Sequence, residues 1–133
     1  MRTLMIALLG LSLIAGPVTA KPALRDVAEI DNALLDLGIA DRIRKECPTI
    51  KARLFKAVTY VRNLEKSAKA KGYSDAEIEA YTDSDAEKAR MRAKGAAFFK
   101  AKGVDTSDPQ SYCALGHAEI QKGSRIGSLL KAK

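Results

Sequence analysis

The two cysteines of this chain constrain its fold more than any other feature of the sequence. Cys47 and Cys113 lie far apart, and two cysteines can form only one disulfide within a chain. That bond would tie the end of the first helical region to the start of the last. Paired cysteines cross-link in oxidising compartments and stay reduced in the cytosol, so the predicted disulfide depends on export.

The N-terminus indicates export. Arg2 is followed by an apolar run over positions 4–15, then by Gly16-Pro17 and by short side chains at positions 18 and 20. This order is typical of a secretory signal peptide, and the run is shorter than the roughly 20 residues of a transmembrane helix. We expect cleavage after residue 20, leaving one domain, residues 21–133, that is periplasmic or secreted and has no transmembrane segment. The alternative is an uncleaved membrane anchor.

The mature chain is expected to fold as a small helical domain. The sequence is 47% hydrophobic and 29% charged, which is too apolar for a disordered tail and too charged for a membrane bundle. The clearest helical pattern is an apolar stripe with steps of three and four residues, predicted to face the core. The stripe consists of Ile50, Leu54, Ala57, Val61, Leu64 and Ala68. An earlier pattern runs from Leu24 to Cys47, is interrupted at Gly38, and stops at Pro48.

Capping residues mark further helix boundaries. Two capping boxes and one Asp-Pro start are present: Ser74 with Glu77, Ser84 with Glu87, and Asp108-Pro109. The last helical region is expected to divide in two near Gly123. Because no segment alternates with a period of two, we expect no strand. The predicted fold class is therefore all-α, a bundle of about five or six helices with one disulfide.

The last region contains three glycines, at positions 116, 123 and 127, which would share one side of a continuous helix. Glycine costs about 1 kcal/mol relative to alanine inside a helix. Their presence predicts that another part of the backbone comes close there, and the disulfide would bring in the region around Cys47. The alternative is a groove that binds a peptide.

Positive charge is concentrated in one segment of a chain whose net charge is +7. Residues 49–71 contain seven basic residues and one acidic residue, Glu65. We expect a basic face, formed by Lys51, Arg62, Lys66 and Lys69, that binds an anionic envelope component or another exported protein. The alternative is a solvated face that only maintains solubility. Nucleic acid is disfavoured, because this basic face lacks interleaved aromatic residues for base stacking and export removes the usual target.

Catalytic chemistry has little support in the sequence. The chain has no phosphate-binding loop, nucleophile elbow, zinc-protease motif or haem-attachment motif. The remaining hypothesis is a metal- or thiol-dependent activity centred on Cys113 and His117, which would share one helix face. The sequence thus favours a non-enzymatic binding or structural module, and we name no catalytic residue, metal ligand or cofactor. A structural or inhibitory partner of another exported protein is the third hypothesis.

Four segments carry a resemblance to a known family. They are residues 43–48 (IRKECP), 72–78 (GYSDAEI), 112–116 (YCALG) and 124–130 (SRIGSLL). In these segments the chain resembles a small exported family of unknown function, DUF5333, found in marine and phototrophic alphaproteobacteria. The resemblance covers most of the mature chain and includes both cysteines. It implies a secreted helical domain with no characterised activity, and it supplies no catalytic residues.

Overall fold

The computed structural model describes residue 16 and residues 20–133, so nearly all of the predicted signal peptide, residues 1–20, lies outside the described residues. Within the described part, six α-helices confirm the predicted all-α class. In chain order the elements are the 3-10 helix η1 (Leu24–Asp26), α1 (Ala28–Glu46), β1 (Ile50–Ala52), α2 (Leu54–Ala70), α3 (Asp75–Asp83), α4 (Asp85–Ala101), α5 (Pro109–Lys122), α6 (Arg125–Ser128) and β2 (Leu130–Ala132).

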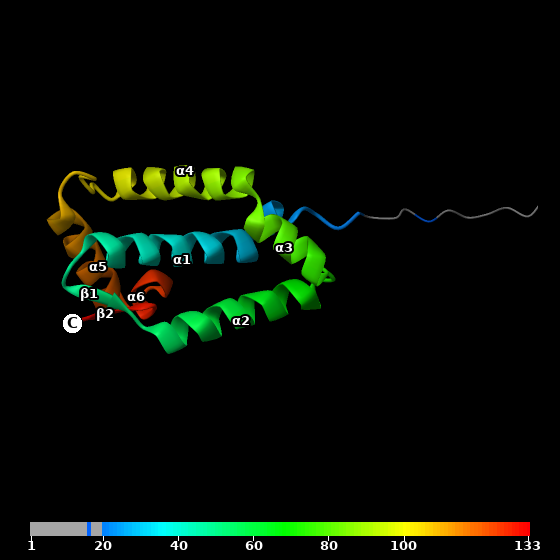
Figure 1. Ribbon diagram of the computed structural model, residues 1–133, viewed down its shortest axis with the longest axis horizontal. Helices are drawn as coiled ribbons and strands as arrows, with labels where there is room; N and C mark the ends of the chain where they lie inside the picture. The colour runs from blue at the N-terminus through cyan, green and yellow to red at the C-terminus, as the bar shows by residue number, and fades with distance from the viewer. Residues whose placement is uncertain (1–15, 17–19) are drawn as a thin grey trace, which may run out of the picture.

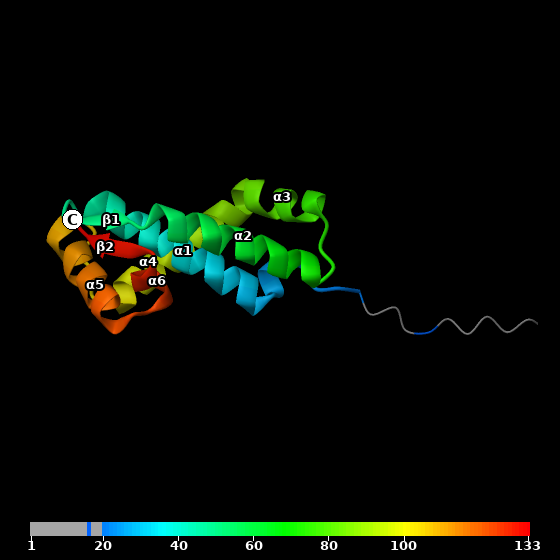
Figure 2. The ribbon, with the colours of Figure 1, turned by 90° about the horizontal axis from the view of Figure 1, so that it is seen from below.

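Three long helices form the body of the molecule. Figure 1 shows α4, α1 and α2 side by side, with α1 in the middle. The central helix contacts both of its neighbours, and α3 connects α2 to α4 at one end. The opposite end is closed by α5, α6 and the two short strands, as Figures 1 and 2 show. Because α2 lies at the edge of this layer, no helix of the described residues packs against its outer side.

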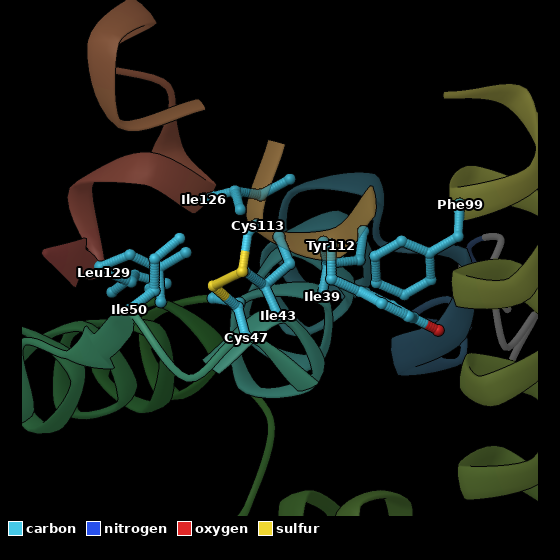
Figure 3. Close-up of a cluster of buried hydrophobic side chains, with 11 residues drawn as sticks. Ile39, Ile43, Cys47, Ile50, Phe99, Tyr112, Cys113, Ile126 and Leu129 are labelled. Carbon is cyan, nitrogen blue, oxygen red and sulfur yellow. A yellow bond between two sulfur atoms is a disulfide. The ribbon is translucent and has the colours of Figure 1, made fainter. Parts of the chain in front are cut away.

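The disulfide lies at the centre of the main core. Cys47 and Cys113 are bonded, with 5.0 Å between their Cα atoms and a sequence separation of 66. The bond joins the end of α1 to α5, as the sequence predicts. Figure 3 shows Ile43 and Ile50 beside it, and both side chains are almost completely buried. The cross-link therefore fixes the C-terminal end of α1 to the C-terminal part of the chain.

Two of the three C-terminal glycines are sites of close packing. A Cβ on Gly116 would lie 2.4 Å from Cδ1 of Ile50 and 2.7 Å from Cγ2 of Ile43. A Cβ on Gly127 would lie 1.9 Å from the carbonyl oxygen of Glu119. The predicted neighbour, the region around Cys47, is confirmed at Gly116, but the prediction of a close backbone is wrong there, because side chains make the contact.

The prediction that the three glycines share one side of a continuous helix is wrong. Gly123 has φ 65° in the left-handed region and ends α5, so Gly127 belongs to the separate helix α6. Glycine adopts this conformation without the steric cost that a Cβ brings. The expected break near Gly123 is confirmed.

The prediction that the chain has no strand is also wrong. β1 and β2 pair as antiparallel strands, with Ile50 opposite Ala132 and Ala52 opposite Leu130. Each strand has three residues, which is too short to show the alternation by which strands are recognised. Ile50, expected in the same helix as Leu54, therefore belongs to this two-stranded ribbon of β1 and β2. In contrast, α1 continues through Gly38, where an interruption was expected.

A buried ionic network joins α1 to α3 and α4. The carboxylate of Asp31 accepts hydrogen bonds from Arg90, from Lys94 at 2.5 Å and from the hydroxyl of Tyr81 at 2.7 Å. Burial raises the pKa of Asp31, but these donors outweigh it and hold the pKa well below its usual range. Burial and the bond to Asp31 raise the pKa of Tyr81 to about 12.

The predicted helix starts are confirmed, with one difference. Ser74 and Glu77 form the full capping box at α3, and Asp108 caps α5 with Pro109 at its first position. Ser84 accepts a hydrogen bond from the amide of Glu87 at α4. The carboxylate of Glu87 does not complete that box, because it pairs with Arg25 and Arg90. It is thus recruited into the ionic network between helices.

Candidate functional site

Helix α2 is the most exposed of the long helices. Ala68 is its only buried residue, and four others that face α1 are half-buried: Ala57, Tyr60, Leu64 and Ser67. The hydroxyl of Tyr60 donates a hydrogen bond to the carbonyl of Ala33 in α1, at 3.1 Å. Helix α2 therefore contacts the rest of the protein along one narrow strip of its surface, and most of the helix faces solvent.

Four large apolar side chains lie on that open surface. They are Leu54, Phe55, Val58 and Val61, with 71%, 93%, 50% and 42% of their area exposed, and we call them the α2 apolar patch. The predicted core stripe is thus wrong for Leu54 and Val61. Positions 54 and 55 are about 100° apart around a helix, so a helix held along one narrow line cannot bury both.

The predicted basic residues lie around this patch in a different arrangement from the one expected. Arg62, Lys66 and Lys69 are exposed residues of α2. Lys51 is exposed but belongs to β1, where it lies directly opposite Lys131 of β2. Like charges facing each other across a strand pair are unfavourable. The strand pair thus extends the basic surface beyond the start of α2, which a helical position for Lys51 does not predict.

One of the four predicted cations is held by acidic neighbours. The ammonium of Lys69 lies 2.7 Å from Asp75 and 2.8 Å from Glu65, and these bonds raise its pKa. Lys69 therefore connects α2 to the start of α3. Among residues 20–133, the salt bridges include no partner for the other cations of this surface. These are Lys51, Arg53, Lys56, Arg62 and Lys66.

The start of α2 carries the opposite charge from the one that stabilises a helix. Its first turn has no acidic residue and contains Lys56, and the N-cap residue Arg53 offers no side-chain acceptor. Both α3 and α4 begin with serine caps and acidic first turns. Cations near a helix N-terminus are unfavourable because they face the positive end of the helix dipole. The largely exposed side chains of Leu54 and Phe55 and this cationic first turn therefore add little to the stability of the fold.

The alternative site, a metal- or thiol-dependent activity at Cys113 and His117, lacks the free thiol that it requires. Cys113 is bonded to Cys47, so it supplies no thiolate. The ring Nε2 of His117 lies 3.3 Å from the hydroxyl oxygen of Thr49, a contact that links α5 to the segment before β1. Within the described part of the chain, no group of three or more potential metal ligands comes together.

Comparisons with known proteins identify one relationship. A model described as a family of unknown function (DUF5333) matches residues 22–131. No curated protein and no solved structure matches the chain. Among the described residues, no helix is long and apolar enough to span a bilayer.

Proposed function

The chain belongs to the DUF5333 family, whose function is unknown, and we propose that its mature part is an exported, non-enzymatic module that binds an anionic lipid surface. The mature part is residues 21–133. The contact surface is the α2 apolar patch together with the surrounding cations of α2 and β1. The partner is the anionic lipid of the cell envelope.

The exposure of Phe55 is the observation that carries the proposal. A phenylalanine 93% exposed, next to a leucine 71% exposed, leaves a large apolar area in water. Helices that lie in a membrane interface combine such residues with lysine and arginine on the adjacent face. Each cation near an anionic membrane contributes about 1 kcal/mol, so the unpaired side chains around the patch would add strongly to binding.

The small size of the patch favours a lipid partner over an acidic protein. A stable protein interface usually buries about 800 Å² on each partner around an apolar core. The patch has four apolar residues. They project from one edge helix, and the groove beside Phe55 is shallow, with a volume of about 340 Å³. A lipid surface requires only that a few projecting side chains insert while the cations contact headgroups.

Cosedimentation with vesicles tests this proposal. We expect residues 21–133 to bind vesicles of phosphatidylglycerol and phosphatidylcholine, and to be released as salt rises or as the anionic lipid is removed. Replacing both Leu54 and Phe55 with serine should weaken binding at least tenfold, because about 1.5–3 kcal/mol is gained when such a side chain is buried. The fold should be unaffected, since both side chains are exposed.

A matched pair of charge variants provides the control. Reversing Arg62 and Lys66 to glutamate should abolish vesicle binding, whereas reversing Lys88 and Lys100 should not. All four are exposed helix residues, and the second pair lies on α4, away from the patch. Equal loss with both pairs would show that only net charge matters. No binding to anionic vesicles at low salt would contradict the lipid assignment and favour an acidic protein partner.

A further inference from the structure

A second surface feature lies on the other side of the central helix. A groove of about 430 Å³ runs between α1 and α4, the two neighbouring helices at the top and centre of Figure 1. Its volume is within the range of sites that hold small molecules. None of the residues that line it belongs to α2 or to the ribbon. This site is therefore independent of the lipid-binding surface proposed above.

Two glycines keep this groove open. Gly38 of α1 and Gly95 of α4 both line it, and a Cβ at either position would have no atom within 4 Å. Both lie inside helices, where glycine lowers stability, and neither has a positive φ. No neighbouring atom therefore requires glycine at positions 38 and 95. In contrast, close neighbours leave no room for a Cβ at Gly116 and Gly127.

The walls and floor of the groove are apolar. Leu34, Leu35 and Met91 line its sides and are half-buried. The floor includes Phe99 and Tyr112, whose rings meet edge to face with centroids 5.2 Å apart. Figure 3 shows these two rings in contact at one end of the main core. An acyl chain fits such a lining, because most of the groups that would surround it are aromatic or aliphatic.

The charged groups at the rim favour an anion. Arg42, Lys45 and Arg92 line the groove together with a single acid, Asp41. Arg42 pairs with Glu46 at 2.9 Å, and Lys45 pairs with Asp41 at 2.6 Å. The salt bridges among residues 20–133 include none for Arg92, which is exposed. Its guanidinium can thus bind a carboxylate or phosphate in the bidentate geometry typical of arginine.

We propose that this groove binds an amphiphile with one acyl chain and an anionic headgroup. The chain lies over Gly38 and Gly95 between α1 and α4, and the headgroup contacts Arg92. A free fatty acid and a lysophospholipid share this chemistry.

Titration of residues 21–133 with dodecanoate, below its micelle concentration, tests the site. We expect saturable binding by calorimetry, with NMR shift changes centred on the amides of Gly38 and Gly95. Dodecyltrimethylammonium has the same chain and a cationic head, and it should bind at least tenfold more weakly. The same titration with lysophosphatidylglycerol distinguishes a lysophospholipid from a free fatty acid, because the amphiphile that fits the site better should bind with the higher affinity.

Variants that fill the groove separate binding from folding. Leucine at both Gly38 and Gly95 should weaken dodecanoate binding at least tenfold while raising the melting temperature, because leucine forms helices better than glycine. The alanine pair is the milder version, with a smaller loss of binding and the same rise in melting temperature.

The contact of the headgroup with Arg92 has its own pair of variants. Arg92→Gln should weaken binding about three- to fivefold, and Lys88→Gln, one turn earlier on α4, should leave it unchanged.

Three results would overturn the assignment. They are shift changes centred on Leu54 and Phe55, equal affinity for the cationic amphiphile, and unchanged binding in a folded leucine variant. If Arg92→Gln and Lys88→Gln behave alike, the assignment of the headgroup to Arg92 is wrong. The variant with serine at Leu54 and Phe55 should bind dodecanoate normally, so failure of the lipid-surface proposal would leave this one intact.

Discussion

Alanine substitutions at the helical glycines should change stability in opposite directions. An ordinary van der Waals contact to a Cβ begins at 3.4 Å, and a Cβ on Gly116 would lie 2.4 Å from Ile50 and 2.7 Å from Ile43. Overpacking of a closed core costs about 1–3 kcal/mol, and the gain in helix propensity returns about 1 kcal/mol. Gly116→Ala should therefore lower the free energy of unfolding by up to about 2 kcal/mol.

Alanine should destabilise the fold more at Gly127 than at Gly116. The added Cβ would lie 1.9 Å from the backbone carbonyl oxygen of Glu119 and 2.3 Å from its carbonyl carbon. Backbone cannot rotate away as a side chain can, so α6 would have to lift from α5. The amide of Ser124 bonds to the same carbonyl at 3.3 Å, and that bond would be lost too. We expect Gly127→Ala to lower the free energy of unfolding by about 3 kcal/mol or more.

Urea denaturation of the two variants, with Gly38→Ala as the control, measures these effects. Gly38 has open space around it, so alanine there should raise the free energy of unfolding by up to about 1 kcal/mol. The predicted order of stability is Gly38→Ala above the parent, then Gly116→Ala, then Gly127→Ala. If Gly116→Ala were as stable as Gly38→Ala, the close packing of α5 against Ile43 and Ile50 would be refuted.

Two further predictions concern the cross-link and the ionic network. Reducing the Cys47–Cys113 bond should lower the free energy of unfolding by about 4 kcal/mol, judged by urea denaturation with and without dithiothreitol, because the bond closes a long loop. A loss below about 1 kcal/mol would contradict this role. The pKa of Asp31 is depressed in the folded state, so its contribution to stability is complete above about pH 4 and is lost as pH falls further. Asp31→Asn should cost about 2 kcal/mol at pH 7 and flatten the acid side of the stability profile, and an unchanged profile would refute the role of the network.

Much of the fold could be predicted from local patterns. Caps such as Ser74 and Asp108 act within a few residues of their own position, so the sequence reveals them directly. The disulfide could be predicted because only two cysteines exist. Gly116 could be assigned a packing role from its cost in a helix, although its partners Ile43 and Ile50 depend on tertiary structure.

The surface of α2 could not be predicted, because periodicity shows that a helix is amphipathic and does not show what covers it. The stripe containing Leu54 and Val61 implied a buried face. Since α2 lies at the edge of the layer, a neighbouring helix covers only part of that stripe. Phe55 falls off the stripe, and its adjacency to Leu54 was the available indication that an apolar residue would remain exposed.

The groove also depends on tertiary structure. Gly38 and Gly95 belong to helices far apart in the sequence that become neighbours only in the folded chain. Gly38 alone predicted an interruption of a helix, which the structure contradicts. Arg92 carried no special pattern, because an exposed arginine on a helix is common.

Fluorescence of a single tryptophan tests the proposed membrane contact most directly. The chain has no tryptophan, so Phe55→Trp would place the only indole in the α2 apolar patch. A second variant, Lys100→Trp on α4, provides the matched control. With anionic vesicles, we expect a blue shift and quenching by brominated acyl chains at position 55, with neither at position 100. An unshifted, unquenched emission from position 55 while the protein is bound would contradict it.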